Sequence, residues 1–197
     1  VASQIALSCM EKQITGEYEA GLESSGIRGL LTAAAYSANT SVYDAACKDP
    51  MLSGMGTTLV AVIAARGKAH IVHAGDSRAY LISPSGVRQL TMDHSMVQEM
   101  LNRGDITQEE AASHPHRNII TRALGVQEMI DVDYTEIPFG TGETLLACSD
   151  GLSNYVHAEQ MYQLASRFNG EELAQQMVQT ALGGGGSDNI TVALIEN

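Results

Sequence analysis

The segment AHIVHAGDSRAYLI, residues 69–82, decides how this chain folds. Residues 69–74 and 78–82 are short runs rich in apolar and β-branched side chains, and the pair Gly75-Asp76 separates them. Such runs, divided by glycine and polar residues, are typical of consecutive strands. The turn signal at residues 83–86 then allows the chain to pair back on itself as a hairpin. Because short turns join antiparallel strands, we expect antiparallel sheets.

Helix and strand patterns continue on both sides of this segment. A long helix is predicted at residues 27–47, because its apolar residues recur at helical spacing until Asp49-Pro50 ends it. Its buried positions should be Leu30, Leu31, Ala34, Ala35, Ala38 and Val42. Further helices are predicted at residues 93–102, 158–167 and 170–182, and further strands at 57–65, 87–90, 131–137, 143–149 and 189–195. We therefore predict a single α+β domain over residues 1–197, with helices packed in layers outside antiparallel sheets.

The composition excludes several classes of protein. Acidic residues outnumber basic ones 23 to 11, and the resulting formal net charge of −12 disfavours nucleic acid as a partner. Every apolar run is far shorter than the ~20 residues of a membrane helix, so no membrane partner is expected. Cys9, Cys47 and Cys148 are too few and too scattered for a disulfide framework or a zinc site. This usage indicates a reducing, cytoplasmic location.

Asp76, Asp150 and Asp188 share one setting, because each lies beside glycine-containing sequence at one end of a predicted strand. Carboxylates at strand ends can converge on one rim of a sheet, where their mutual repulsion favours a cation among them. Oxygen ligands without histidine or cysteine favour Mg²⁺ or Mn²⁺ over Zn²⁺. Aspartate beside glycine is also common in ordinary turns, so these residues alone leave both interpretations open.

Six motifs in a fixed order indicate a family. They are Gly56-Thr57-Thr58, Gly75-Asp76-Ser77-Arg78-Ala79-Tyr80, Leu90-Thr91 with Asp93-His94-Ser95, the run HPHRNIITRALG at residues 114–125, Ser149-Asp150-Gly151-Leu152-Ser153, and Ser187-Asp188-Asn189-Ile190-Thr191-Val192. Together they resemble the metal-dependent serine/threonine phosphatases of the PPM, or type 2C, family in its compact bacterial form, over nearly the whole chain. The resemblance implies an α/β/β/α sandwich, in which helices flank two antiparallel sheets.

The resemblance also implies roles for the three aspartates. Asp150 and Asp188 would be ligands of a dinuclear Mg²⁺ or Mn²⁺ centre, and Asp76 would hold a third, weaker ion together with Asp150. In the family, a metal-activated water attacks the phosphorus of phosphoserine or phosphothreonine in line, without a phosphoenzyme. The implied partners are phosphorylated proteins, the substrates of a cognate serine/threonine kinase. Residues 104–118 correspond to the family's variable flap, which either selects substrate or is a surface loop.

One part of the family pattern has no counterpart in this sequence. The family's opening strands carry an arginine for the substrate phosphate, an Asp-Gly pair that bridges the two metals, and a histidine proposed as general acid. We expect these strands to be missing before Val1, so no catalytic residue can be assigned and the chain as given should have little or no activity. Their absence would also expose a sheet edge that could support oligomerisation. Two alternatives stay open: a pseudophosphatase binding module, against which the retained aspartates argue, and a regulatory phosphatase fragment of a larger signalling protein.

Structural roles are predicted for the remaining polar residues of these motifs. His94, His114 and His116 are expected to be hydrogen-bonded surface or turn histidines. Arg78 and Arg122 are expected to form ion pairs with neighbouring aspartates.

Overall fold

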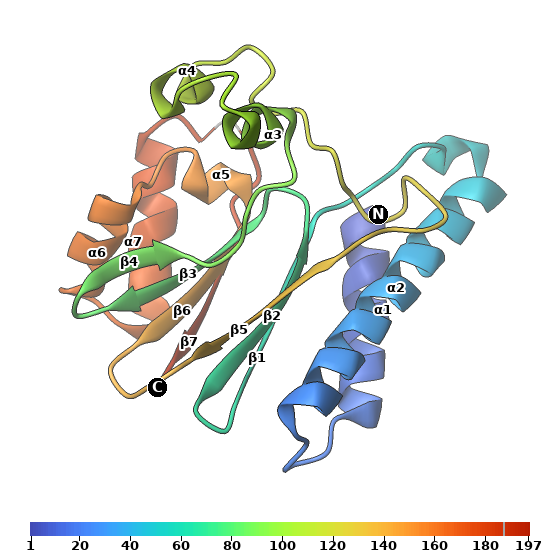
Figure 1. Ribbon diagram of the computed structural model, residues 1–197, viewed down its shortest axis with the longest axis horizontal. Helices are drawn as coiled ribbons and strands as arrows, with labels where there is room; N and C mark the ends of the chain where they lie inside the picture. The colour runs from blue at the N-terminus through green and yellow to red at the C-terminus, as the bar shows by residue number, and fades with distance from the viewer. Residues whose placement is uncertain (187) are drawn as a thin grey trace. The chain divides into compact units, whose positions relative to one another are not determined.

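A computed structural model describes residues 1–186 and 188–197, and Figure 1 shows its helices and strands. The motif residue Ser187 lies outside the described residues. The strands are β1 (Leu59–Ala65), β2 (Lys68–Ala74), β3 (Arg78–Ser83), β4 (Gly86–Gln89), β5 (Asp133–Pro138), β6 (Thr144–Cys148) and β7 (Val192–Glu196). The α-helices are α1 (Ala2–Glu17), α2 (Ser24–Lys48), α3 (Met96–Arg103), α4 (Gln108–Ala112), α5 (Asp150–Ser153), α6 (Ala158–Ala165) and α7 (Gly170–Gly183), and the short 3₁₀-helix η1 spans Pro50–Leu52.

The chain divides into two compact units, and the first contains α1 and α2. This unit comprises Val1–Ala61, Val72–Asp76 and Asp93–Tyr134. Its helices α1 and α2 pack against each other, and all six predicted apolar positions of α2 are buried. Helix α2 ends at Asp49 as predicted, and Pro50 opens η1.

A buried asparagine on α2 fixes a long loop of the same unit. Asn39 donates from Nδ2 to the carbonyl oxygens of Gln127 and Glu128, and its Oδ1 accepts the Gly125 N–H at 2.8 Å. Gly125 has a φ of +86°, and a Cβ there would lie 2.1 Å from Cγ1 of Val42. Only glycine fits this position, because a side chain would be strained in conformation and would also clash with the helix.

The second unit is built on a four-stranded antiparallel sheet in the order β4-β3-β6-β7. Residues 83–86 form the predicted hairpin turn between β3 and β4, since Ser83 pairs with Gly86. Helices α6 and α7 pack on this sheet, where Leu146, Met161 and Met177 belong to one apolar cluster (Figure 1). A separate cluster contains Leu81 and Leu145 of the sheet. The other sheet of the molecule has the order β1-β2-β5.

Three predicted boundaries were wrong near the candidate site. The helix expected from residue 93 begins at Met96, because the preceding residues bond to other loops and Ser95 caps the helix through the Gln98 N–H. Asp150 does not end a strand: β6 stops at Cys148, and Asp150 is the first residue of α5. The last strand begins at Val192 rather than at residue 189.

No helix in the described ranges combines the length and the apolar character that a bilayer crossing requires.

Candidate metal centre

Asp150 and Asp188 lie on two segments that a serine holds together. The Ser149 Oγ donates to the carbonyl oxygen of Asn189 and accepts the Thr191 N–H, both at 3.0 Å. The Ser149 N–H also donates to the Thr191 carbonyl oxygen at 3.1 Å. These three hydrogen bonds engage residues 189–191 with Ser149, so β7 begins only at Val192, and they set Asp150 beside the segment that carries Asp188.

Glycine at position 151 permits this close approach of the two segments. A Cβ on Gly151 would lie 2.4 Å from the carbonyl oxygen of Asn189, which is closer than real Cβ atoms come to other heavy atoms. The residue after Asp150 must therefore lack a side chain, and the Asp-Gly sequence at 150–151 has a steric reason.

The electrostatics of the pair favour a bound cation. Burial raises the pKa of Asp150 above its ordinary value, and the negative charge of Asp188 raises it further. The Gly151 N–H and the positive charge of Arg78 oppose this rise without cancelling it. A nearby cation would offset the repulsion between the two carboxylates, and hard divalent cations prefer such oxygen ligands. The donor set therefore fits Mg²⁺ or Mn²⁺.

Asp76 belongs to the first compact unit. It is half-buried and follows Gly75 directly after β2. Gly75 has a φ of +107°, and a Cβ there would approach Cγ2 of Thr58 to 2.4 Å. The structure thus brings Asp150 and Asp188 together within one unit, and it places Asp76 at a tightly packed turn in the other.

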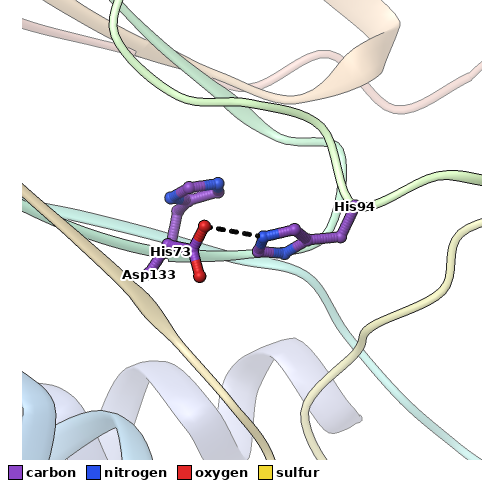
Figure 2. A group of neighbouring side chains, drawn as sticks. All are labelled: His73, His94 and Asp133. Atoms are coloured by element: carbon purple, nitrogen blue, oxygen red, sulfur yellow. Dashed lines mark ion pairs between the residues drawn. The ribbon is translucent and has the colours of Figure 1, made fainter. Parts of the chain in front are cut away.

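Two histidines and an aspartate gather close to the Asp76 turn, and sequence analysis missed them as a group. Figure 2 shows His73 of β2, His94 of the loop before α3 and Asp133 at the start of β5. One potential ligand atom from each lies within 4.8 Å of the others. The His73 and His94 rings are stacked, with centroids 4.6 Å apart. The sequence indicates this cluster only through His73, which lies within the apolar run at residues 69–74, because a buried imidazole needs polar partners.

Hydrogen bonds and ion pairs hold the other polar residues of the motifs. Arg122 forms the expected ion pair, since its Nη1 lies 2.9 Å from Oδ1 of Asp133. His94 is hydrogen-bonded as expected, but it is buried and is not a surface residue. His114 accepts the His116 N–H at 3.1 Å in an exposed turn, as predicted. Arg78 donates from Nη1 to the hydroxyl of Tyr80.

Comparison with known proteins identifies the family. The family model described as protein phosphatase 2C matches residues 1–182. The serine/threonine phosphatase stp of Listeria monocytogenes is 49% identical over 146 residues, which cover 74% of this chain and 58% of that protein. This chain therefore spans less than two thirds of the length of that relative.

Solved structures agree with this assignment. The crystal structure of the serine/threonine phosphatase PstP/Ppp of Mycobacterium tuberculosis matches with a TM-score of 0.88 and 34% identity, over 100% of this chain and 83% of that chain. A structure of the PstP catalytic domain in complex with two manganese ions matches with a TM-score of 0.83 and 32% identity, over 98% of this chain and 79% of that chain. These matches confirm the predicted α+β fold of two antiparallel sheets flanked by helices. The chain belongs to the protein phosphatase 2C family.

Proposed function

We propose that this chain carries the metal site of a serine/threonine protein phosphatase that hydrolyses phosphoserine and phosphothreonine on proteins. The observation that supports this most directly is the Asp150–Asp188 pair. It combines a pKa of Asp150 raised by burial and by a second carboxylate with a backbone arrangement that brings the two segments together. In a member of the 2C family, such a pair is best explained as a ligand set for divalent cations. Both compact units would belong to one phosphatase domain.

Asp150 and Asp188 would hold Mg²⁺ or Mn²⁺, and Asp76 would contribute to a further, weaker site. Bound ions of this kind lower the pKa of a water molecule and neutralise phosphoryl oxygens. The related PstP structure in complex with two manganese ions makes Mn²⁺ the first ion to test. The chain's own contribution is to fix the two carboxylates, through the Ser149 hydrogen bonds and through the absence of a side chain at Gly151.

The substrates would be proteins phosphorylated by a serine/threonine kinase in the cytoplasm, which this enzyme would oppose. The segment at residues 104–118 would contact them. It carries the short helix α4, which a reciprocal pair of hydrogen bonds between Thr107 and Glu110 caps at its start. A capped helix within a loop can present side chains in a defined orientation, and this is the property that selection among phosphoproteins requires.

We further propose that residues 1–197 hydrolyse phosphopeptides slowly by themselves. Two carboxylates and Asp76 are a small ligand set for two or three ions, and the sequence lacks the Asp-Gly pair that bridges the metals in the family pattern. Joining an upstream segment that carries this pair should therefore raise activity strongly.

The test is phosphate release from a phosphothreonine peptide in Mn²⁺, with EDTA as the control. We expect low release from the 197-residue chain, strong release from the extended chain, and loss of that release in its Asp188→Asn variant. The exposed Glu11 on α1 offers a matched charge control, and Glu11→Gln should retain activity. An extended, folded chain that binds Mn²⁺ but releases no phosphate would refute the phosphatase proposal and favour a binding module.

A further inference from the structure

His94 binds both polar backbone groups of Gly75, the residue before Asp76. The Gly75 N–H donates to Nδ1 of His94 at 3.1 Å, and the His94 N–H donates to the Gly75 carbonyl oxygen at 2.9 Å. The His94 carbonyl oxygen in turn accepts the Thr121 N–H at 2.8 Å. One buried residue thus ties the Asp76 turn to the loop at residue 121.

The Gly75 contact assigns the proton of the His94 ring, and Nη1 of Arg122, which also lies 3.2 Å from Nε2, then donates to Asp133. Nδ1 accepts a backbone N–H and must therefore be unprotonated. The proton then lies on Nε2, which is 3.3 Å from Oδ2 of Asp133 and can donate to it (Figure 2). Arg122 binds the other oxygen of Asp133 at 2.9 Å and so orients this carboxylate. A chain of contacts runs from Arg122 through Asp133 and His94 to Gly75.

A metal ion is a poorer explanation of the same cluster. Nη1 of Arg122 lies 3.2 Å from Nε2 of His94 as well as 2.9 Å from Oδ1 of Asp133. A cation bound between this histidine and this carboxylate would meet the guanidinium charge at contact distance. Burial is the largest influence on the pKa of His94 and lowers it, while the hydrogen bond to Asp133 opposes this change; the net lowering agrees with a neutral ring that accepts a backbone hydrogen bond.

From this geometry we infer that His94 is a positioning residue for Asp76, and that its Nδ1 fixes the Gly75–Asp76 turn in the conformation that presents the carboxylate. The effect of His94 on metal binding rests on the proposed function, because it requires Asp76 to be a metal ligand. The effect of His94 on the conformation of the Gly75–Asp76 turn is independent of the proposed function. Residues that orient metal ligands typically change metal affinity by 10- to 100-fold when they are replaced.

Two substitutions at this position separate the Nδ1 contact from general packing. His94→Asn keeps an acceptor oxygen at the place of Nδ1, whereas His94→Gln removes that acceptor and keeps a polar group near the place of Nε2. Both variants lose the stacked ring next to His73, so this loss is common to both. The comparison therefore reports on the hydrogen bond to Gly75.

The first readout is hydrogen exchange of the Gly75 amide by NMR in the metal-free chain. We expect slow exchange in the wild type and in His94→Asn, and roughly tenfold faster exchange in His94→Gln. Equal exchange in the two variants would overturn the inference. Long-range ¹H–¹⁵N spectra of the wild type should also show a proton on Nε2 only, and a proton on Nδ1 would overturn the inference even if both variants failed to fold.

The second readout is Mn²⁺ affinity, with Asp76→Asn as the reference. If Asp76→Asn weakens Mn²⁺ binding, His94→Gln should weaken it about tenfold or more and His94→Asn should not. Equal weakening in the two variants would contradict the positioning role. If Asp76→Asn has no effect on Mn²⁺, the proposed role of Asp76 in the metal site fails, and the Gly75 amide still decides whether His94 fixes the turn.

Discussion

Replacing Gly151 with alanine should weaken the proposed metal site without adding or removing any charge. The new Cβ would lie 2.4 Å from the Asn189 carbonyl oxygen and 3.0 Å from its carbonyl carbon, whereas ordinary contacts begin at 3.4 Å. Because both neighbours are backbone atoms, no side-chain rotation can relieve the clash. The segment that carries Asp150 and the segment that carries Asp188 must therefore separate by about 1 Å.

The magnitude follows from two opposing effects. Overpacking of this kind costs about 1–3 kcal/mol, and alanine in the helix α5 recovers at most about 1 kcal/mol relative to glycine. With the full recovery, we expect the free energy of unfolding to fall by up to about 2 kcal/mol. Metal–ligand distances tolerate changes of only about 0.2 Å, so Mn²⁺ affinity should fall by about tenfold or more.

Urea unfolding in EDTA and calorimetric titration with Mn²⁺ measure the two effects. The control is Gly29→Ala, because Gly29 lies within α2 with open space around its Cβ position. This variant should gain about 0.5–1 kcal/mol of stability and keep the wild-type Mn²⁺ affinity. If Gly151→Ala is as stable as the wild type and binds Mn²⁺ equally well, the close approach of the two segments does not shape the site.

Three further results are expected. Ser149→Ala should lower the free energy of unfolding by about 1–2 kcal/mol, because two hydrogen bonds to the segment at residues 189–191 are lost. An unchanged free energy of unfolding in urea titration would show that this contact does not stabilise the fold. In EDTA, the raised pKa of Asp150 should stabilise the folded state at a pH below the pKa that Asp150 has in the unfolded chain. This stabilisation should be lost as the pH rises through the higher pKa that Asp150 has in the folded chain. Denaturation across pH should reveal this slope in the wild type, and an identical slope in Asp150→Asn would argue against it. Hydrogen bonds from Thr107, chiefly from its backbone N–H and then from its hydroxyl, lower the pKa of Glu110. The protection of the α4 amides from hydrogen exchange should therefore persist above the ordinary glutamate pKa and disappear as the pH falls through the lowered pKa. Hydrogen exchange in α4 that does not change with acid would show that this cap does not cause the protection.

Periodicity and turn chemistry made much of the fold predictable. The buried face of α2 follows a 3.6-residue repeat, so its six apolar positions could be assigned before any contact was known. The hairpin between β3 and β4 follows from the residues of its turn. Both patterns are local and strong enough to survive tertiary packing.

The short elements around the site could not be predicted in this way. Helix α5 has four residues, which is too short to show any period, and it begins at Asp150 beside contacts of Ser149 with residues about forty positions later. The late start of the last strand, at Val192, has the same cause. These boundaries depend on hydrogen bonds between segments that a local pattern does not contain.

The two groups of polar residues differed in how well the sequence revealed them. Asp150 and Asp188 could be proposed because each stands in or close after glycine-containing sequence at a strand end, although their proximity had to come from the fold. The cluster of His73, His94 and Asp133 draws on three separate segments, and each of these residues has an ordinary structural explanation when it is read alone. Only the contacts reveal that His94 connects Asp133 to the Asp76 turn.

The most direct test of the central claim is Mn²⁺ titration of the 197-residue chain by calorimetry, with Asp150→Asn, Asp188→Asn and Glu11→Gln in parallel. If Asp150 and Asp188 form the metal site, the wild type and Glu11→Gln should bind Mn²⁺ with equal affinity. Each aspartate variant should then bind at least 10- to 100-fold more weakly. Equal binding by all four proteins, or no binding by a folded wild type, would contradict the assignment of this carboxylate pair as the metal site.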